Sequence, residues 1–577
     1  MRPLILILAL LSGQAWGATQ HICATAAGSG DGSSLANCKA AGTNFAGITV
    51  GANDVLRVCD KIRGTLTVTS TNNVTVDLDC SGEASGEITG ADVVTAFDAA
   101  DGNGEYATTG TFSVPMWVLV DGVAWREGIK GQLADNEWAF NSTTGGTQKV
   151  FLGSNPAGRT VEIATRSRAI DFITSTGARV IGGRIYGIRY ASGTAGIRFN
   201  ASAGSVEGTA FYAVARPTDV VGLGSMTVDS VTVNYCGDGP DANKATDRPT
   251  LVVTDSDITN CKYQDWFANT EVSHAVTFDG ESIACTDCAS ITATGNRISR
   301  GLSAIVTRVD SAASQTFSAN WIENTVDDGI SLGCTNSSGT LQARVTSNII
   351  RDAGGPGGWG LSAYAMDIAL ASCGNGSDVT IAHNAVPRPS NGIRFTAAAS
   401  QTGVVRHLNN VYVNANPYLV TGTHYFANWN TVSATHSLTI TSDDNDYYQS
   451  AGAGAFRWVS GAAARTYANY SLFLSDSGQD SNSIRLDPLW LGGPNPTTAE
   501  GFRLSADSPL CAAGTDLGDE IADYFGDYMY NGKWDIGAFR RDSCYRRSRD
   551  GNLDMARTRA QVASRCLGIP GRYPEGL

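Results

Sequence analysis

A short phrase recurs along the central part of the chain, between about residues 180 and 411: a small or polar residue, one further residue, and then Ile or Val. Short β-branched runs that recur every roughly 20–30 residues are typical of a β-solenoid. The 3.6-residue apolar stripes of helical repeats are missing from this part of the sequence. The apolar residues of this first ladder are Ile185, Phe211, Val231, Ile258, Ile298, Ile322, Ile350, Val386 and Val411.

A second apolar ladder follows the first, one turn later in each repeat. Each coil therefore has at least two strands, and stacked coils place like residues above one another at about 4.8 Å, the strand spacing of a sheet. Stacked apolar side chains would fill the bore of the solenoid, so we expect an all-β fold, a right-handed parallel β-helix. The second ladder comprises Ile197, Val221, Leu251, Ile283, Ile305, Ile330, Ile368, Ile393 and Leu419.

Asparagine occupies the same place in several repeats, two residues before the apolar residue of the first ladder. Stacked Asn side chains can hydrogen-bond along the stack and to the backbone of the turn, whose polar groups need partners. We therefore expect an asparagine ladder at one turn of the coil. Its predicted members are Asn296, Asn320, Asn348, Asn384 and Asn409.

The two ends of the chain differ from its middle. Arg2, the apolar run that follows it and the small residues near position 17 have the form of a signal peptide, so we expect a secreted or periplasmic protein. No other stretch reaches the ~18 apolar residues of a membrane span. The predicted parts are a signal peptide in 1–17, an N-terminal cap and first coils in 18–110, a β-hairpin insertion in 111–165, the β-helix with its cleft in 166–440, a closing β/loop segment in 441–541 and a basic helical tail in 542–577.

Composition agrees with a solenoid and narrows the partners. The 577 residues are too many for one compact core, whereas a solenoid grows lengthwise without that limit. The net charge of −14 argues against nucleic acid, which would require a basic face. It also disfavours a strongly anionic substrate unless the surface carries a local basic patch. We expect a monomer that binds a polysaccharide or oligosaccharide.

The 13 cysteines indicate an oxidising compartment. Two of the pairs expected from proximity join adjacent coils. The Cys-x-x-Cys sequence at 285–288 lacks a second pair of metal ligands nearby, so a disulfide is preferred there to a metal site. The expected pairs are Cys23 with Cys38, Cys59 with Cys80, Cys236 with Cys261, Cys285 with Cys288, and Cys334 with Cys373.

Several phrases resemble a known group of proteins. GDGSSLANCKAA near the N-terminus, GEITGADVVTAF at 86–97, DDGISLG at 327–333 and WDIGAFRR at 534–541 resemble secreted bacterial β-helix proteins of the pectate-lyase-like superfamily. The resemblance implies carbohydrate polymers as the substrate class. It leaves the activity open, because the superfamily holds lyases, hydrolases, epimerases and binding proteins. In a GHG motif of polygalacturonase type, Trp359 would replace the His.

Turn lengths between the two ladders predict a cleft. The turns are short in 298–305, 322–330 and 386–393, and long in 231–251, 258–283 and 350–368. Long loops would leave one edge of the solenoid on both sides of two short-turn coils, and long loops on a rigid scaffold are where function usually lies. We therefore expect a binding cleft between loops 259–282 and 351–367.

Carboxylates around this cleft are the candidate catalytic groups. Asp327 and Asp328 are expected on its floor, and Glu281 and Asp367 on its walls. Glu281 shares a ladder position with Asp328 two coils away, which brings the two carboxyls near the ~6.5–9.5 Å separation of an inverting glycosidase. Asp367, one rung away, would raise the pKa of a floor carboxyl. The Asp-Asp-Gly sequence at 327–329 is equally typical of a turn.

Other side chains of the cleft suggest sugar binding. His274 is a candidate base on the first loop. Trp rings would stack on pyranose faces or hold their loops in place, and arginines on the same face would hold a carboxylate. The candidate substrate-binding residues are Tyr263, Trp266, Arg308, Trp359, Tyr364 and Arg394.

Three classes of function fit these residues. A glycoside hydrolase would use paired carboxylates and require no cofactor, and the acid-rich cleft favours this class. A polysaccharide lyase would abstract the C5 proton of a uronate with His274 or Lys262, while calcium or an arginine neutralises the carboxylate. A non-catalytic protein would only bind polysaccharide. A calcium site formed by the acidic residues 443–446 is a further alternative to a plain acidic turn.

Overall fold

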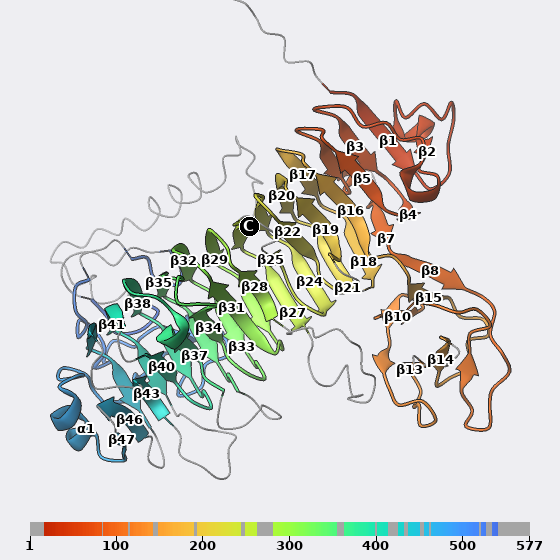
Figure 1. Cartoon of the computed structure of the whole chain (residues 1–577). Coiled ribbons are helices and arrows are strands. Elements are labelled where there is room, and N and C mark those ends of the chain that lie inside the picture. The colour runs from red at the N-terminus through yellow and green to blue at the C-terminus, as the bar shows by residue number, and fades with distance from the viewer. Residues whose placement is uncertain are drawn as a thin grey trace, which may run out of the picture.

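The computed structural model is a rod of stacked coils with a smaller β lobe beside its N-terminal end (Figure 1). Three sheets form the sides of the rod, and within the described residues sheet A has 14 strands, sheet B has 12 and sheet C has 13. The right-handed parallel β-helix predicted from the sequence is confirmed. The described residues are 17–82, 85–113, 116–141, 148–189, 193–243, 248–261, 281–354, 363–398, 401–413, 425–431, 437–449, 455–460, 463–517, 521–526 and 534–539.

One coil passes through the three sheets in the order A, B, C. Sheet A stacks β2 (Lys39–Ala40), β1 (Thr19–Cys23), β3 (Val55–Val58), β6 (Thr75–Asp77), β17 (Ala178–Ile181), β20 (Ala203–Glu207), β23 (Ser225–Asp229), β26 (Thr250–Thr254), β29 (Ser290–Thr294), β32 (Ala313–Ser318), β35 (Leu341–Thr346), β38 (Ser377–Ala382), β41 (Thr402–Leu408) and β44 (Ser437–Asp443). Sheet B stacks β4 (Lys61–Arg63), β7 (Glu87–Thr89), β18 (Arg184–Ile188), β21 (Ala210–Val214), β24 (Thr232–Cys236), β27 (Asp257–Cys261), β30 (Arg297–Ser299), β33 (Trp321–Glu323), β36 (Ile349–Arg351), β39 (Ala385–Pro387), β42 (Val411–Val413) and β45 (Asp446–Tyr448). Sheet C stacks β5 (Leu66–Thr69), β16 (Arg168–Ile173), β19 (Ala195–Asn200), β22 (Thr218–Val221), β25 (Asp241–Asn243), β28 (Glu281–Thr286), β31 (Ser303–Val309), β34 (Ile330–Cys334), β37 (Met366–Ala369), β40 (Ile393–Ala397), β43 (Tyr425–Thr431), β46 (Ala455–Ser460) and the antiparallel β47 (Ala463–Tyr467).

In-register apolar rungs fill the bore, but the sequence ladders were partly wrong. Leu251 lies in sheet A, because the sheet C strand of that coil is β25, whose inward residue is the small Ala242. The predicted long turn at 231–251 is therefore wrong, since it spans a whole strand of sheet C. At five further ladder positions the observed register places a residue other than the predicted one. Thr218 takes the place of Val221, Val233 of Val231, Met366 of Ile368, Tyr412 of Val411 and Ala427 of Leu419.

The asparagine ladder lies at the turn from sheet A to sheet B. In each rung the Asn Oδ1 accepts the backbone N–H and the Nδ2 of the Asn in the preceding coil, at 2.9–3.1 Å. The ladder continues through Asn410 and not Asn409, which occupies the left-handed position before it with φ 59°. Its members are Asn296, Asn320, Asn348, Asn384, Asn410 and Asn445.

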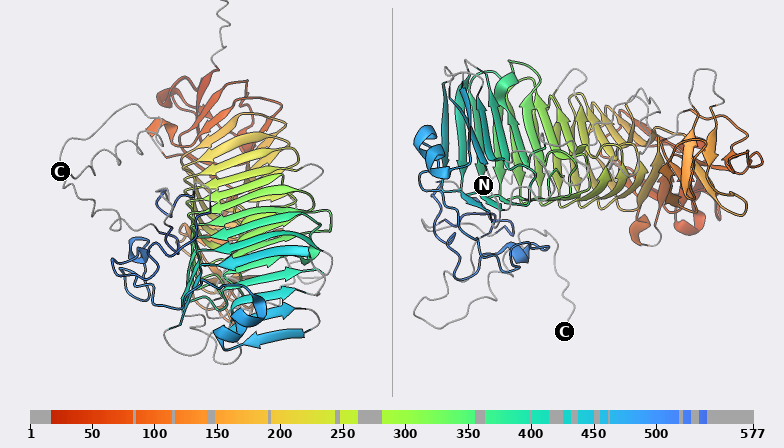
Figure 2. Two further views of the ribbon diagram at one scale, coloured as in Figure 1. Left: turned by 90° about the vertical axis from the view of Figure 1, so that its left-hand side faces the viewer. Right: turned by 90° about the horizontal axis from the view of Figure 1, so that it is seen from below.

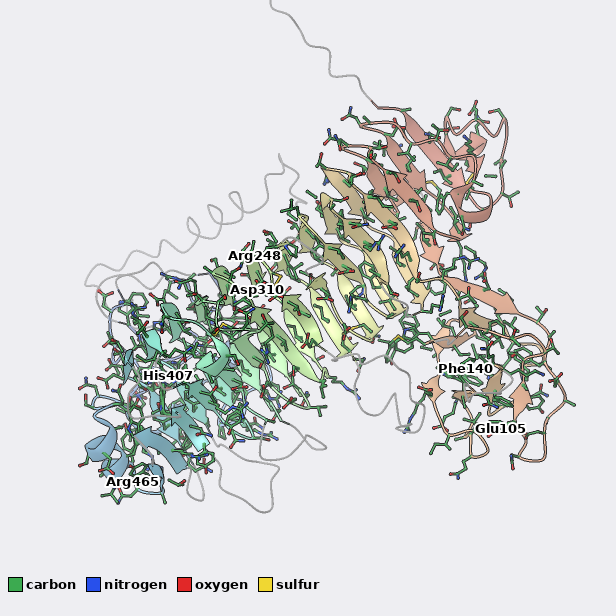
Figure 3. The ribbon with its side chains drawn as sticks, viewed as in Figure 1. Glu105, Phe140, Arg248, Asp310, His407 and Arg465 are labelled. Atoms are coloured by element: carbon green, nitrogen blue, oxygen red, sulfur yellow. A yellow bond between two sulfur atoms is a disulfide. The ribbon has the colours of Figure 1, made fainter. Side chains whose placement is uncertain are left out.

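The connection from β7 to β16 forms the lobe beside the rod. It begins at β8, earlier than position 111 expected from the sequence, because β8 pairs antiparallel with β15 inside the lobe. Trp125, Trp138 and Phe140 belong to its own core, and Figure 3 places Phe140 and Glu105 there. Its two four-stranded sheets comprise β8 (Ala91–Val94), β10 (Val118–Val120), β11 (Val123–Ala124) and β15 (Val161–Ala164), and β9 (Tyr106–Ala107), β12 (Arg126–Glu127), β13 (Glu137–Phe140) and β14 (Val150–Leu152).

The C-terminal segment closes the rod and then covers part of sheet B. Helix α1 (Tyr470–Ser477) packs Phe473 against Phe456 of the last coil, with ring centroids 4.7 Å apart. Farther on, Trp490 and Phe502 pack on outward residues of sheet B such as Ile349. Figure 2 shows this segment alongside the rod. Within the described residues no helix is long and apolar enough to cross a membrane, and the tail 542–577 lies outside them.

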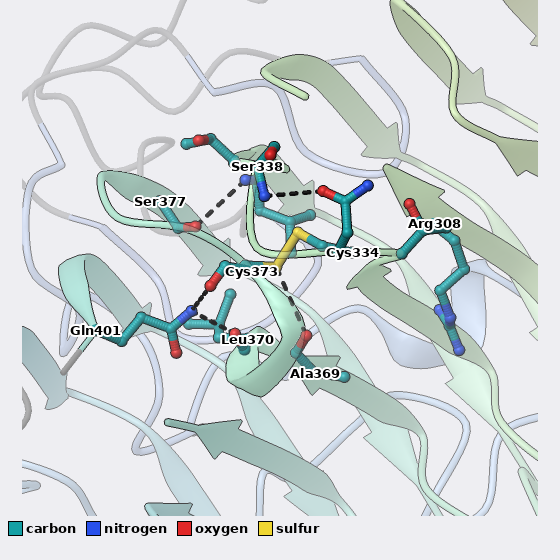
Figure 4. Close-up of a disulfide and its surroundings, with 12 residues drawn as sticks. Arg308, Cys334, Ser338, Ala369, Leu370, Cys373, Ser377 and Gln401 are labelled. Carbon is teal, nitrogen blue, oxygen red and sulfur yellow. Dashed lines mark hydrogen bonds between the residues drawn. A yellow bond between two sulfur atoms is a disulfide. The ribbon is translucent and has the colours of Figure 1, made fainter. Parts of the chain in front are cut away.

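Five cysteine pairs lie at bonding distance, and they are the five expected from the sequence. Their Cα atoms are 4.4–6.0 Å apart. Cys236 and Cys261 face each other in the register of β24 and β27, and Cys334 bonds to Cys373 beside the 3₁₀ turn Leu370–Ser372 (Figure 4).

Candidate functional site

The outer face of sheet C carries one continuous row of residues, each paired with the next by the parallel register. Small side chains in the middle of the row separate two groups of charged ones. The row thus places two ionic clusters on one side of the rod, which Figure 1 shows from β16 to β43. Its members are Asp171, Arg198, Asp219, Asp241, Ala284, Val306, Ser331, Asp367, Arg394 and Asn428.

The second cluster is built around Asp367 on β37 and Arg394 on β40, one rung apart. The Arg394 guanidinium donates from Nε to Asp367 Oδ1 at 2.7 Å and from Nη2 to Oδ2 at 2.5 Å, a two-point pair that fixes both side chains. The guanidinium also lies 4.6 Å from the centroid of the Tyr364 ring. Asn428 Nδ2 donates to the Tyr364 hydroxyl at 2.9 Å, so one network spans three rungs.

Asp328 lies where the turn 324–329 enters β34. One of its carboxyl oxygens accepts the backbone N–H of Tyr364 at 2.8 Å, and the residue is 7% exposed. Burial, reinforced by the negative charges of Asp367 and Asp327, raises the pKa of Asp328 well above its ordinary value. Burial and Asp367 also raise the pKa of the half-buried Asp327, against the opposing charge of Arg394. The group therefore places a buried carboxyl whose pKa is raised beside an ion-paired carboxylate.

Glu281 occupies the position predicted for it relative to Asp328. Glu281 pairs with Ser303, and the Ala304 N–H donates to the Asp328 carbonyl at 3.1 Å, which sets Asp328 opposite Ser303 in the next coil. Two rungs separate the backbones of Glu281 and Asp328 by about 9–10 Å.

Two other side chains lie elsewhere than the sequence suggested. Asp367 was expected on a wall but belongs to floor strand β37, because the turn before it ends at residue 365. Tyr364 is buried, with 4% exposure, so it supports the site from beneath. Both differences arise because β37 begins at Met366, two residues before Ile368, which the sequence analysis had taken as the rung residue of this coil.

The remaining predicted residues divide into two groups. Arg308, on β31 opposite Gly333, donates to Ser331 Oγ at 3.0 Å, and within the described chain it forms no ion pair (Figure 4). Because the long turn predicted at 231–251 is wrong, the first wall of the predicted cleft rests on loop 262–280 alone. That loop and 355–362 lie outside the described residues, and so do Tyr263, Trp266, His274 and Trp359.

The first ionic cluster was missed by the sequence reasoning. Arg216 lies among three carboxylates, with Nη1 2.9 Å from Asp241 Oδ2, Nη2 3.0 Å from Asp238 Oδ2, and Asp219 at 4.0 Å. Burial raises the pKa of Asp219 to about 6 and of Asp241 to about 7, although Arg216 opposes both shifts. If β25 had been recognised as a strand, the sequence would have placed Asp219 and Asp241 at the same position of successive coils.

The acidic turn 443–446 contacts the closing segment. Asp443 accepts the backbone N–H of Asn482 at 2.7 Å, and Asp446 accepts that of Leu486 at 3.1 Å. Asp444 accepts a hydrogen bond from the Thr515 hydroxyl. Among the residues that the structure describes, no group of three or more His, Cys, Asp or Glu side chains is arranged to hold a metal ion.

The architecture is a right-handed parallel β-helix. No family model and no curated protein matches the chain. Similar solved structures include XylC in complex with xylose (12% identity, 78% of this chain, 89% of that chain, TM-score 0.46) and pectate lyase Pel9A (13%, 92%, 98%, 0.40). The periplasmic alginate epimerase AlgG is a third (8%, 67%, 76%, 0.34). Similarity this low carries no functional argument, so the function must be inferred from the residues of the chain itself.

Proposed function

We propose that the chain is a polysaccharide-active enzyme, a glycoside hydrolase whose acid is Asp328. The observation that supports this most is the raised pKa of a buried Asp328 beside Asp367, whose charge Arg394 compensates. A buried carboxyl group whose pKa is raised by its environment can act as the general acid of a glycosidase. The sequence phrases that resemble proteins of the pectate-lyase-like superfamily support a carbohydrate polymer as the substrate class.

In this mechanism Asp328 protonates the leaving oxygen of the glycosidic bond. The Tyr364 N–H donates to Oδ1 of Asp328, so in this proposal the other carboxyl oxygen, Oδ2, carries the proton that is transferred. Glu281, two rungs away, accepts a proton from the attacking water, whose oxygen forms the new bond to the anomeric carbon. The separation of about 9–10 Å between backbones suits an inverting pair with a water between the carboxyls. No cofactor is required.

A polysaccharide lyase is the second candidate, and Arg308 favours it. Arg308 on the face of sheet C has no acidic partner among the described residues, so its guanidinium could bind the carboxylate of a uronate. Arg394 is less suited to that role because Asp367 already occupies it on two points. The base would then be His274 or Lys262 from loop 262–280, and calcium would join Arg308 in neutralising the substrate.

The test exchanges the proton donor without removing the turn contact. In Asp328→Asn the amide oxygen still accepts the Tyr364 N–H, but the side chain can no longer protonate a leaving group. On whichever neutral or uronate polymer the parent releases reducing ends, turnover should fall by ~10²–10⁴. Asp507→Asn, at an exposed position of the closing segment, is the matched control and should retain full activity.

Three outcomes separate the candidates. Release of reducing ends without ultraviolet absorbance, lost in Asp328→Asn, supports the hydrolase. An unsaturated, ultraviolet-absorbing product supports the lyase and overturns the assignment of Asp328 as glycosidic acid. If the parent binds a polymer but cleaves none, the protein is a binding protein and the catalytic proposal fails.

A further inference from the structure

A second polar surface lies on sheet A, on a different side of the rod from the Asp328 site. Strands β29, β32, β35, β38 and β41 stack along the rod axis (Figure 1), and their register aligns outward residues in two parallel rows. Hydroxyl groups alternate with two guanidinium groups in the first row, and the second row adds an amide and a carboxylate. The first row comprises Thr292, Thr316, Arg344, Thr380 and Arg406, and the second Ser290, Ser314, Gln342 and Asp378.

The parts of both rows on β32, β35, β38 and β41 line a pocket of about 360 Å³. Leu517 of the closing segment forms one edge of it, and the remaining lining comes from sheet A. Arg344, Gln342 and Ser314 are exposed, whereas Thr380 is buried at the base. The pocket is therefore open to solvent and lined mainly by hydrogen-bonding groups.

We propose that this pocket binds a segment of anionic, uronate-type polysaccharide, separately from the chemistry on sheet C. Among the described residues, its charged lining comprises Arg344, Arg406 and Asp378, an excess of one positive charge on a protein whose net charge is −14. The pocket thus supplies the local basic patch that the composition would require for an anionic ligand. Arginine is the side chain best suited to bind a carboxylate on two points.

The spacing of the two arginines suits an extended sugar chain. Arg344 and Arg406 lie in the same row with Thr380 between them, so their backbones are two rungs, about 10 Å, apart. Carboxylates on alternate sugars of an extended polymer could meet one arginine each. Between them, the threonine hydroxyls and the Gln342 amide recur at the strand spacing and offer hydrogen bonds to sugar hydroxyls.

Arg406 has donors to spare for such a ligand. It binds Asp378 at 2.5 Å and Thr380 at 3.5 Å through Nη1, and within the described residues its Nε and Nη2 are not engaged. The ion pair is about two-fifths exposed on each side, and exposed pairs contribute little stability. Exchange of Asp378 for a ligand carboxylate therefore costs little.

Binding of full-length protein to oligogalacturonate, measured by calorimetry, tests the proposal. The Asp328→Asn background prevents turnover, and the methyl-esterified oligomer provides the same sugar without charge. Arg406→Gln should weaken binding of the acidic oligomer at the pocket about tenfold, the expected effect of losing one hydrogen bond to a charged group. Binding should also weaken with added salt.

Arg179→Gln is the matched control. Arg179 is an exposed arginine of the same sheet, 2.9 Å from Glu207, but it lies on β17 away from the pocket. Four results would each overturn the proposed binding site. The esterified oligomer could bind with equal affinity, Arg406→Gln could leave the affinity unchanged, or Arg179→Gln could lose as much affinity as Arg406→Gln. The fourth result is that no galacturonate, mannuronate or guluronate oligomer binds. Because Arg406→Gln leaves the Asp328 site intact, cleavage of short oligomers should be unchanged, which separates this test from that of the enzymatic proposal.

Discussion

The asparagine ladder is the most direct place to measure what stabilises the coils, and Asn348 is its central rung. The side chain is fully buried. Its Oδ1 accepts the Asn320 backbone N–H at 3.0 Å, and its Nδ2 donates to the Phe317 carbonyl at 3.0 Å. It also bonds to the side chains of Asn320 and Asn384, both at 2.9 Å. One amide thus serves three coils.

Replacing Asn348 by alanine removes all four bonds at once. The Asn320 backbone N–H and the Phe317 carbonyl lose these partners in a part of the fold that water does not reach. At roughly 1–3 kcal/mol for each buried group left unsatisfied, the two groups cost about 2–6 kcal/mol. That is a large fraction of the ~5–15 kcal/mol that stabilises a typical domain.

Asn348→Asp provides a sharper test, because it preserves shape. The carboxylate can still accept from Asn320, but its second oxygen would face two acceptors, the Phe317 carbonyl and Asn384 Oδ1. Repulsion and burial should raise the folded-state pKa of the new carboxyl above the unfolded value of about 3.9. The folded state then binds more protons, so stability should fall as pH rises from 4 to 7.

Denaturant unfolding followed by circular dichroism measures the overall loss, and native-state hydrogen exchange of the turn amides measures it locally. Asn336→Ala, at an exposed turn where Asn336 accepts the Ser338 N–H at 2.8 Å, is the control and should change little. A midpoint for Asn348→Ala equal to that of the control would refute the ladder's energetic role. So would an Asn348→Asp variant equally stable at both pH values.

Three further substitutions test other parts of the fold and of the candidate site. Burial raises the pKa of Asp241 to about 7, so ionising this carboxyl costs folding stability as the pH rises from 4 to 7. In Asp241→Asn the thermal midpoint should therefore fall less steeply with rising pH. An unchanged slope would contradict this. Replacing Cys334 and Cys373 together by serine opens a link between residues 39 positions apart and should cost about 2–4 kcal/mol in denaturant unfolding, and an unchanged midpoint would contradict this. Arg394→Gln removes the charge that lowers the pKa of Asp328, so the alkaline limb of the pH–rate profile should move to higher pH, whereas Arg394→Lys should retain its position.

The sequence predicted the parts of the fold that depend on repetition. Ile298, Ile322 and Ile350 are rungs of sheet B as expected, because each is the inward residue of a three-residue strand next to an asparagine. The ladder drifted by one residue at Asn409 and Asn410, where two identical side chains are adjacent. Only the backbone decides between them, since the first takes the left-handed conformation and its side chain leaves the turn.

The rest could not be predicted because a strand of a three-sided coil can lack any apolar signature. Strand β25 consists of Asp241, Ala242 and Asn243, and its small Ala242 belongs to the core that fills the bore. Periodicity alone therefore passed over it and assigned Leu251 to the wrong sheet. The Arg216 cluster depends on that strand, so it was missed as well. The position of Asp328 in the coil was predicted because Ile305 of β31 and Ile330 of β34 mark adjacent rungs, whereas Ile368 of β37 shifted the predicted rung by two residues.

The two clusters of sheet C show why parallel stacking can produce either a stabilising network or a reactive group. Near Arg216, three carboxylates each have an oxygen within 4.0 Å of the same guanidinium, so each acid interacts directly with a positive charge. Beside Arg394, the guanidinium is used by Asp367, while Asp328 has only a backbone N–H and a neighbouring acid. Burial and the neighbouring acid favour the protonated form of the Asp328 carboxyl. Because no group among the described residues accepts this proton in the proposed site, the carboxyl can donate it to a substrate. The position of the arginine relative to the acids therefore distinguishes the two clusters more clearly than the number of acids does.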